Sequence, residues 1–192
     1  MKSAPPSPLI FSLHRRRGSC FRSGWLSENC GIVDIEFNIM TKRISLRVNG
    51  LERSIQVEAR TTLLEMVREQ LGLTGAKLGC DIQVCGACTL LLDGKPVSAC
   101  SVLAMDADGC DVLTIEGLGD RNSFHPLQEA FMEFGALQCG YCTSGFILTA
   151  KALLDECPQP SEQQIKEYLG GNFCRCGCYQ EIVQAIKNVA RS

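Results

Sequence analysis

The sequence lacks a long apolar run and lacks an excess of positive charge. No stretch approaches the roughly 18 consecutive apolar residues that a membrane-spanning helix needs. Lys and Arg number 19 against 21 Asp and Glu, which gives a net charge of −2, and the basic residues cluster only near the N-terminus. Nucleic-acid-binding domains carry a basic patch or stripe. We therefore expect neither a membrane span nor a nucleic-acid partner.

Nucleotide-binding and export signals are also missing. No glycine-rich segment resembles a Rossmann or P-loop phosphate cradle, so a nucleotide cofactor would have to sit on another chain. The apolar run at residues 9–11 is too short for a secretory signal, and its arginines follow it instead of preceding it. No hydrophobic stretch follows these arginines, as a twin-arginine signal requires. We expect a cytoplasmic protein.

Residues 1–39 differ in composition from the rest of the chain. They contain three of the seven prolines and no acidic residue before Glu28, and they show no helix or strand periodicity. An Arg- and Ser-rich, acid-poor segment is typical of a transit peptide, but an ordered pattern begins immediately after Met40, as it would behind an upstream translation extension. We expect a disordered N-terminal extension over residues 1–39.

Cysteine is unusually abundant, with 13 residues in 192. That fraction lies below the ~8–10% of small secreted disulfide scaffolds and well above ordinary usage. The count is odd, so disulfide pairing would leave at least one thiol unpaired. A single cysteine is often only a small buried hydrophobic residue. Eight of these cysteines, however, stand at tight spacings that favour metal binding.

The first set comprises Cys80, Cys85, Cys88 and Cys100. Its first three members have the C-x4-C-x2-C spacing of plant-type 2Fe–2S ferredoxins, in which a more distant cysteine supplies the fourth thiolate. The small residues Gly86 and Ala87 would let backbone N–H groups approach the cluster. The alternative is a structural four-cysteine zinc site, which usually pairs two short knuckles instead of one ten-residue loop.

The second set comprises Cys139, Cys142, Cys174 and Cys176, as a C-x2-C and a C-x-C pair. Cys139 and Cys142 are expected on one face at the start of a helix, whose positive end favours thiolate. The second pair needs an irregular turn, which nearby glycines can supply. A 2Fe–2S cluster fits this set, and spacing alone leaves zinc nearly as good an interpretation.

The pattern around the first set predicts an α+β domain over residues 42–117. Apolar and polar residues alternate over residues 44–48 and again over residues 55–57. The turn pair Asn49-Gly50 lies between these two segments, so the pattern predicts a β-hairpin. Thr62 and Glu65 form a capping box that begins a helix ending at Gly72. A strand is expected at residues 89–92, followed by an Asp93-Gly94 turn and a second strand through Val97, and a last strand is expected at residues 112–115.

The period becomes helical after residue 119. Four apolar stripes predict a small four-helix bundle over residues 122–191, with Pro126 at the first position of one helix and a capping box at Ser161 and Gln164. Two domains of about 70 residues each have small cores, so a metal site in each would add stability. His125 is expected to cap or pack instead of binding metal. Four cysteines have no partner at metal spacing and are expected to be structural or to lie in disordered segments: Cys20, Cys30, Cys110 and Cys157.

Together the two sets resemble the small iron–sulfur subunit of the molybdenum hydroxylase (xanthine oxidase) family. The resemblance rests on GCDIQVCGAC at residues 79–88, SAC at 98–100, TIEGL at 114–118, HPLQ at 125–128, QCGYCTSG at 138–145 and GNFCRC at 171–176. These segments match in order and spacing from about residue 44 to residue 189. Residues 1–39 lie outside the match.

The resemblance implies an N-terminal β-grasp, ferredoxin-like domain and a C-terminal four-helix domain, each with one 2Fe–2S cluster. The chain would be the non-catalytic electron-transfer subunit of a heteromeric oxidoreductase. Molybdopterin, as its cytosine dinucleotide, would lie on a large partner subunit, and FAD on a medium subunit unless another acceptor is used. Electrons would pass from the molybdopterin through the helical-domain cluster and then the β-grasp cluster. The resemblance also places Gln138 and Cys139 against the pterin. The alternative interpretation of Gln138 is an ordinary helix-capping amide.

The sequence departs from the family pattern at three places: Gln83 where the family often has Gly, Ser144 where it has Pro, and Gly177-Cys178 where it has Thr-Gly. A positive φ at Gln83 would cost about 1 kcal/mol. Ser144 and Gly177 favour the aldehyde-oxidising members, and an aldehyde or an N-heteroaromatic compound is the expected substrate of the complex. Cys178 is a spare thiol beside the second set, with its role left open.

Two other functions are alternatives to the electron-transfer subunit. One is a free-standing 2Fe–2S redox carrier or sensor, expected as a stable monomer, and the other is a zinc-stabilised interaction module.

Overall fold

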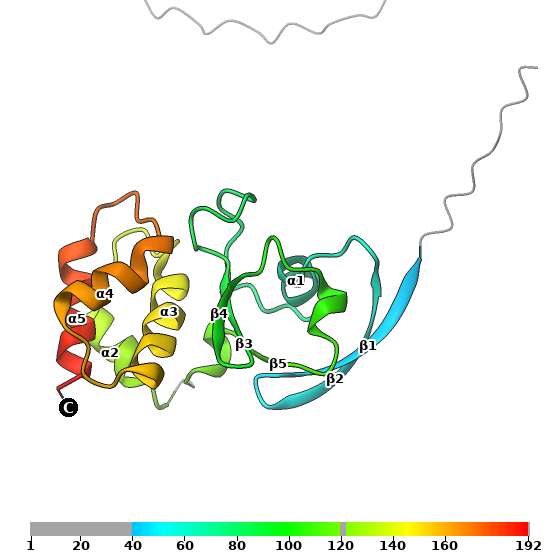
Figure 1. Cartoon of the computed structure of the whole chain (residues 1–192), viewed down its shortest axis with the longest axis horizontal. Helices are drawn as coiled ribbons and strands as arrows, with labels where there is room; N and C mark the ends of the chain where they lie inside the picture. Colours follow the sequence, from blue (N-terminus) through cyan, green and yellow to red (C-terminus); the bar gives the residue numbers. More distant parts are fainter. Residues whose placement is uncertain (1–39, 120–121, 192) are drawn as a thin grey trace, which may run out of the picture. The chain divides into compact units, whose positions relative to one another are not determined.

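The computed structural model describes residues 40–119 and 122–191 of the chain. The predicted N-terminal extension, with Cys20 and Cys30, lies outside these residues. No helix in the described ranges is both long enough and apolar enough to cross a membrane. Figure 1 shows a sheet with its loops beside a group of helices.

The sheet has five strands in the order β2-β1-β5-β3-β4. β1 and β2 form the predicted antiparallel hairpin, β3 and β4 form the second, and β5 runs parallel to β1 and antiparallel to β3. Both turns contain the residue pair that their sequence predicts, because Asn49-Gly50 and Asp93-Gly94 all have positive φ angles. The strands are β1 (Thr41–Val48), β2 (Leu51–Glu58), β3 (Thr89–Leu92), β4 (Lys95–Ser98) and β5 (Asp111–Leu113).

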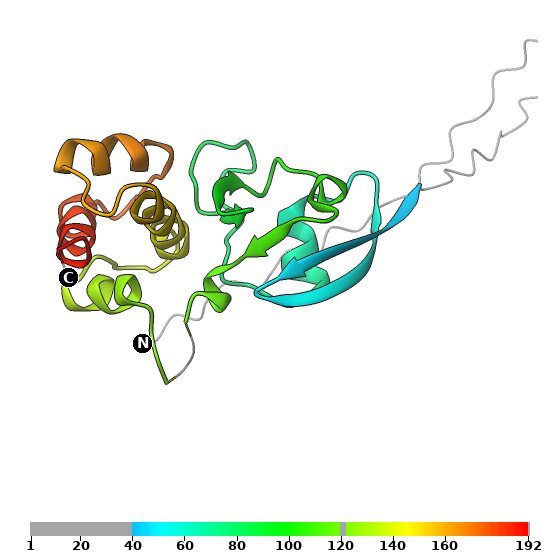
Figure 2. The same ribbon diagram turned by 60° about the horizontal axis from the view of Figure 1, so that its bottom comes forward.

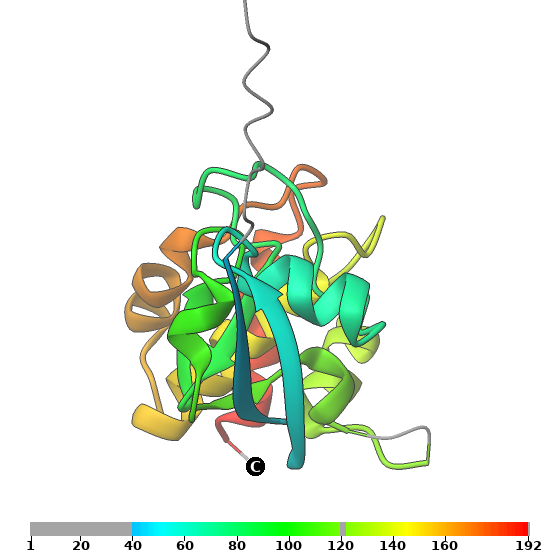
Figure 3. The same cartoon turned by 90° about the vertical axis from the view of Figure 1, so that its right-hand side faces the viewer.

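A short helix packs on the sheet where the capping box predicted it. The Thr62 hydroxyl accepts the Glu65 backbone N–H, and the Glu65 carboxylate accepts the Thr62 N–H. Figure 3 shows this helix beside the β1–β2 hairpin. The sequence predicted one α-helix, but only α1 (Leu63–Glu65) is α-helical, and Met66–Gln70 continues as a π-helix.

The last strand of the sheet is shorter than expected. The sequence predicted a strand over residues 112–115, whereas β5 ends at Leu113. The chain then tightens into a 3-10 turn at Ile115–Gly117, which leads toward the helices. A second 3-10 turn, at Ala104–Ala107, lies between β4 and β5.

Four α-helices follow and share a second hydrophobic core. Each packs against its neighbour, in the pairs α2–α3, α3–α4, α4–α5 and α5–α2. Figure 2, turned from the first view, shows them grouped around this core. Pro126 begins the first helix, and the Ser161–Gln164 capping box begins the third, as predicted. The bounds are α2 (Pro126–Glu133), α3 (Thr143–Glu156), α4 (Glu162–Tyr168), which continues into a 3-10 turn at Leu169–Gly171, and α5 (Tyr179–Val189).

Helix α3 connects the two cores. Its residues Leu148 and Ala152 are fully or almost fully buried in the core of the sheet, whereas Phe146, Ile147 and Ala150 belong to the core of the helices. This two-sided burial brings the loop before β3 against the beginning of α3. Part of each predicted cysteine set lies in these segments: residues 80, 85 and 88 of the first set and residues 139 and 142 of the second.

Candidate metal centres

The first cysteine set lies in the loop of residues 79–88, with Cys100 just after β4. The loop bends sharply because Asp81, Gln83 and Gly86 all have positive φ angles of 59° to 66°. This bend directs backbone N–H groups at the Cys80 thiol, which accepts hydrogen bonds from Val84 N and Cys85 N at 3.3 Å each. Hydrogen bonds from the backbone, the strongest from Ile82, lower the pKa of Cys80 to about 7. The loop therefore favours a thiolate at this position.

The other two thiols of the first set are buried in the core of the sheet. Cys88 and Cys100 expose only 2% and 7% of their surface. Burial raises the pKa of Cys88 to about 11, and the neighbouring Cys100 thiol contributes to the rise. The first set thus consists of an outer pair, Cys80 with Cys85, and an inner pair, Cys88 with Cys100.

The second set surrounds the first turn of α3. Cys139 was predicted on this helix, but it is exposed and lies in a bend before it, because Gly140 has a φ of 79° and breaks the helical path. Cys142 is the residue that caps the helix. The turn predicted for Cys174 and Cys176 is present, with Gly177 at a φ of 82°. The second set is therefore held by a helix start and two glycine-dependent bends.

The thiols of the second set also form two pairs. The sulfur atoms of Cys139 and Cys176 lie 3.5 Å apart in the outer pair. A hydrogen bond from the Tyr141 backbone N–H is the main cause of the lowered pKa of Cys139. In the inner pair, burial and the adjacent Cys174 thiol raise the pKa of Cys142 to about 12.

The backbone of Cys174 is fixed by an aromatic side chain. Its N–H donates to the Tyr179 hydroxyl oxygen at 2.9 Å. The Tyr179 ring in turn packs edge-on against Phe146, with ring centroids 6.2 Å apart. Cys174 is therefore held in place by α3 and α5 together.

Pairs of thiols are the donor arrangement that a binuclear iron–sulfur cluster needs. Each iron of a 2Fe–2S cluster takes two cysteine thiolates, whereas structural zinc takes four ligands around one ion. Among residues 40–119 and 122–191, no group of three or more His, Cys, Asp or Glu side chains is arranged to hold a metal ion. The two-and-two grouping of each set fits a 2Fe–2S cluster.

The remaining thiols of the described chain are all free. Cys178 is buried beside Cys174, and burial raises its pKa. Cys110 and Cys157 are partly buried in other parts of the chain. His125 does not join either cysteine set, because its Nδ1 accepts the Leu127 backbone N–H and caps α2. Its predicted role as a capping residue is confirmed.

Gln138 lies in the exposed bend that carries Cys139. The cap of α3 is Cys142, with no side-chain hydrogen bond, so Gln138 does not cap this helix. No hydrogen bond joins its amide to another residue in the described part of the chain. The side chain is therefore available to a molecule bound at this surface.

Hydrogen bonds join the two thiol-bearing regions. Phe173 N–H donates to the Cys85 carbonyl oxygen at 2.9 Å, and Asn172 Nδ2 donates to the Gly86 carbonyl oxygen at 3.2 Å. Tyr141 and Ser144 donate to backbone carbonyls on the other side of the first loop. Sequence reasoning missed all four of these contacts, because a contact between two loops has no periodic signal. The quoted segments that contain them were the available indication.

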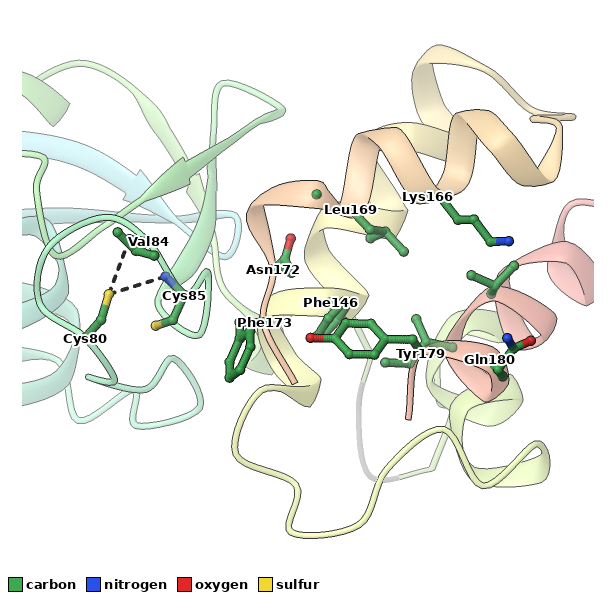
Figure 4. Close-up of a pocket in the computed structure, with 13 residues that line it drawn as sticks. Cys80, Val84, Cys85, Phe146, Lys166, Leu169, Asn172, Phe173, Tyr179 and Gln180 are labelled. Atoms are coloured by element: carbon green, nitrogen blue, oxygen red, sulfur yellow. Dashed lines mark hydrogen bonds between the residues drawn. The ribbon is translucent and has the colours of Figure 1, made fainter. Parts of the chain in front are cut away.

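A mostly apolar cavity of about 780 Å³ lies beside this junction. Figure 4 shows the Cys80–Cys85 thiols at one end, Phe173 and Asn172 in the middle, and Tyr179 with Phe146 toward the helices. Phe173 and Val84 are 51% and 65% exposed at its edge. The outer pair of the first set is therefore accessible from the surface of the chain.

Comparison with known proteins agrees with this geometry. Residues 46–113 match a 2Fe–2S iron–sulfur cluster binding domain, and residues 114–187 match a second 2Fe–2S binding domain. The chain is 48% identical to the nicotine 6-hydroxylase small subunit of Paenarthrobacter nicotinovorans, over 74% of this chain and 86% of that protein. It is 42% identical to the aldehyde oxidoreductase iron–sulfur-binding subunit of Escherichia coli, over 77% and 71% respectively.

A solved structure shows the same fold. The match is to quinoline 2-oxidoreductase from Pseudomonas putida 86, with a TM-score of 0.76, 45% sequence identity and coverage of 78% of this chain and 93% of that chain. The two domain matches, the thiol pairs and these relatives agree with one another. The chain belongs to the family of small iron–sulfur subunits of molybdenum hydroxylases.

Proposed function

We propose that this chain carries electrons, one at a time, from a molybdopterin on a large partner subunit to a flavin or another acceptor. The observation that carries the proposal is the grouping of eight thiols into four pairs within two cluster-binding domains. The apolar cavity in the described part of the chain is lined by no Asp, Glu or His side chain that could act as an acid or base on a substrate. Its role is that of the non-catalytic electron-transfer subunit of an oxidoreductase.

Each thiol pair would hold one iron. Cys80 with Cys85 and Cys88 with Cys100 would hold the first cluster, and the second cluster would lie between the Cys139–Cys176 and Cys142–Cys174 pairs. When bound, such clusters accept and release single electrons. The chain's residues would orient the thiolates, and the backbone N–H groups around Cys80 would stabilise their charge. The apolar walls around the inner pairs would exclude water.

The finer description of the fold is part of the proposal. A β-grasp domain is supported by the sheet order and the short helix packed on the sheet. A four-helix bundle is supported by the ring of contacts among α2 to α5. A reducing compartment such as the cytoplasm is supported by the free thiols of the described chain.

The partners follow from the family. A large molybdopterin subunit is supported by the relatives, which are named as small or iron–sulfur-binding subunits. A flavin-binding subunit that carries FAD is the proposed acceptor, because this chain has no nucleotide-binding motif of its own. The names of the relatives refer to the oxidation of nicotine, quinoline and aldehydes. We therefore propose an N-heteroaromatic compound or an aldehyde as the substrate of the complex.

Isolation of the native protein from its own cells tests the assembly. We expect the chain to elute in a complex that contains molybdenum, and we expect its visible absorption to bleach when the substrate of that complex is added. Elution as a stable monomer without molybdenum would instead support a free-standing 2Fe–2S carrier or sensor. Anaerobic preparation is needed so that the clusters survive.

Gln138 is the proposed contact with the pterin. Its exposed, unpartnered amide lies next to Cys139, which belongs to the outer pair of the second set. The amide would donate to or accept from a pterin edge, and loss of such a buried hydrogen bond costs about 1–3 kcal/mol.

The Gln138→Ala substitution tests this contact within the complex. It should slow cluster reduction by substrate and leave reduction by dithionite unchanged. The matched control is Leu137→Ala, which removes a neighbouring exposed side chain but no amide. An unchanged substrate-driven rate in Gln138→Ala would refute the contact.

A further inference from the structure

The two thiol sets are connected by one backbone hydrogen bond that joins them almost directly. Phe173 N–H donates to the carbonyl oxygen of Cys85 at 2.9 Å. Cys85 belongs to the outer pair of the first set, and Phe173 immediately precedes Cys174 of the inner pair of the second set. The remaining steps of this path, from the Cys85 thiol to the Cys174 thiol, are covalent bonds of the main chain and of the two cysteine side chains.

We infer that this hydrogen bond, Phe173 N–H to Cys85 C=O, is the main electron path between the two clusters. The inference deepens the proposed function and rests on it. Electrons tunnel more efficiently through covalent and hydrogen bonds than across gaps between atoms that are not bonded. With both clusters bound, one electron would pass from the second cluster, by way of Cys174, to the first cluster, by way of Cys85. No bond forms or breaks, and no proton moves.

Three further hydrogen bonds cross the same junction, but each gives a longer path. Tyr141 Oη donates to the Leu78 carbonyl, so this route passes through a whole phenol side chain. Ser144 Oγ donates to the Gly75 carbonyl, five positions before Cys80. Asn172 Nδ2 donates to the Gly86 carbonyl, but this route still has to pass through Phe173 to reach Cys174.

The surroundings hold the path in place from both sides. On the side of the helices, Tyr179 Oη accepts the Cys174 N–H at 2.9 Å. On the side of the loop, the Gly86 carbonyl accepts hydrogen bonds from Asn172 Nδ2 and from Thr89 Oγ1. A Cβ atom on Gly86 would lie 2.5 Å from Asn172 Nδ2 and 2.6 Å from the Gly171 carbonyl oxygen. This close approach brings Phe173 N within hydrogen-bonding distance of Cys85 O.

Only the N–H group of Phe173 is needed, and the ring is not. The Phe173 side chain is 51% exposed at the edge of the cavity (Figure 4). Phe173→Ala therefore keeps the path, whereas Phe173→Pro removes the N–H donor. Proline is sterically acceptable at this position, because the preceding Asn172 has φ −113° and ψ 130°, the extended region that a residue before proline prefers.

The experiment uses the whole complex with both clusters present. One electron per chain is introduced by pulse radiolysis, and rapid-freeze EPR then follows its passage between the two distinguishable cluster signals. Phe173→Pro should slow this step several-fold, while Phe173→Ala and Tyr141→Phe should leave it unchanged. Redox titration of each variant shows whether the cluster potentials stay the same, so that a slower step cannot be assigned to a lost driving force.

A second variant covers the case in which Phe173→Pro does not fold. Replacing the peptide bond at Phe173 with an ester, by incorporating phenyllactic acid, removes the N–H and leaves the side chain and shape in place. A several-fold slower step in the ester variant supports the inference. An unchanged rate, with both EPR signals present, overturns the inference and leaves the proposed function standing. Absence of the two cluster signals in the unaltered protein would overturn the proposed function itself.

Discussion

Gln83 is a strained residue in the loop that carries the first thiol set. Its φ of 61° lies in the left-handed region, which costs a residue with a Cβ atom about 1–2 kcal/mol. The sequence raised this question, because the family resemblance leads one to expect Gly at position 83. In the structure, residue 83 has a positive φ, which glycine adopts without strain and glutamine does not. The bend is needed because it directs the Val84 and Cys85 N–H groups at Cys80.

The Gln83→Gly substitution should therefore stabilise the protein. Relief of the left-handed strain is partly offset by the larger entropy of glycine in the unfolded chain, which leaves a gain of up to about 1 kcal/mol in the free energy of unfolding. Ile82→Gly is the matched control, because Ile82 is exposed and its φ is not positive, so this substitution should destabilise. Urea unfolding of the cluster-loaded protein measures both. Destabilisation by Gln83→Gly as large as that of Ile82→Gly would contradict the strain.

The cysteine sets show what residue spacing can and cannot predict. Eight cysteines at diagnostic spacings predicted two four-thiol sets, and the structure brings the members of each set together in pairs. The expected helix under Cys139 was wrong because Gly140 turns the chain with a φ of 79°. The contacts of Asn172 and Phe173 with the first loop were not predicted, since they depend on how two domains pack.

Helix α3 is the element on which the junction depends. A Cβ atom on Gly145, in its first turn, would lie 2.1 Å from the Gly86 carbonyl oxygen. That oxygen is backbone and is already held by hydrogen bonds from Thr89 and Asn172. The first turn of α3 can therefore approach the loop only because residue 145 is glycine.

The Gly145→Ala substitution should push α3 away from the loop. Overpacking of this kind lowers the free energy of unfolding by about 1–3 kcal/mol. Gly170→Ala is the matched control, because a Cβ atom there meets nothing within 4 Å and its φ is not positive. Thermal unfolding of the cluster-loaded variants measures the difference. Equal melting temperatures for the two variants would show that the junction tolerates a methyl group.

Helices α4 and α5 are joined by a charged side chain at the surface. The Glu162 carboxylate accepts from Lys166 Nζ and Lys187 Nζ at 2.8 Å each. The hydrogen bond from Lys166, followed by that from Lys187, lowers the pKa of Glu162 to about 2. A lowered carboxyl pKa stabilises the fold above the ordinary pKa of glutamate, and this contribution is lost as the pH falls toward 2.

The Glu162→Gln substitution should weaken the fold slightly and by the same amount at about pH 6 and about pH 8, because the carboxylate is fully ionised across this range. Added salt should shrink the loss, since the ion pairs are exposed. Glu167→Gln is the control, because Glu167 accepts a hydrogen bond from Gln163 and forms no ion pair within the described chain. Urea unfolding at two salt concentrations measures both. A loss that grows with salt would contradict the ion-pair assignment.

At the level of elements, local signals predicted most of the secondary structure. Both sequence-predicted capping boxes, both hairpin turns and all four C-terminal helices are present. The π-helical turn at Met66–Gln70 and the 3-10 turns at Ala104–Ala107 and Ile115–Gly117 were missed, because segments of three to five residues are too short to show a period of their own. The parallel pairing of β1 with β5 was not specified, since it joins strands far apart in the sequence.

At the level of the whole molecule, each of the two small hydrophobic cores buries some of the thiols of one set. Cys88 and Cys100 belong to the core of the sheet, and Cys174 belongs to the core of the helices. Cys80, Cys85 and Cys139 lie nearer the surface, where electrons can enter and leave. A metal cluster bound to each set would link buried and exposed segments and add stability to domains of this size.

The quantity that tests this interpretation most directly is the iron and acid-labile sulfide content of the native protein, purified without oxygen. Two four-thiol sets, each with one 2Fe–2S cluster, predict about four iron and about four sulfide per chain. The reduced protein should then show two distinguishable EPR signals. Stoichiometric zinc with no labile sulfide would contradict it.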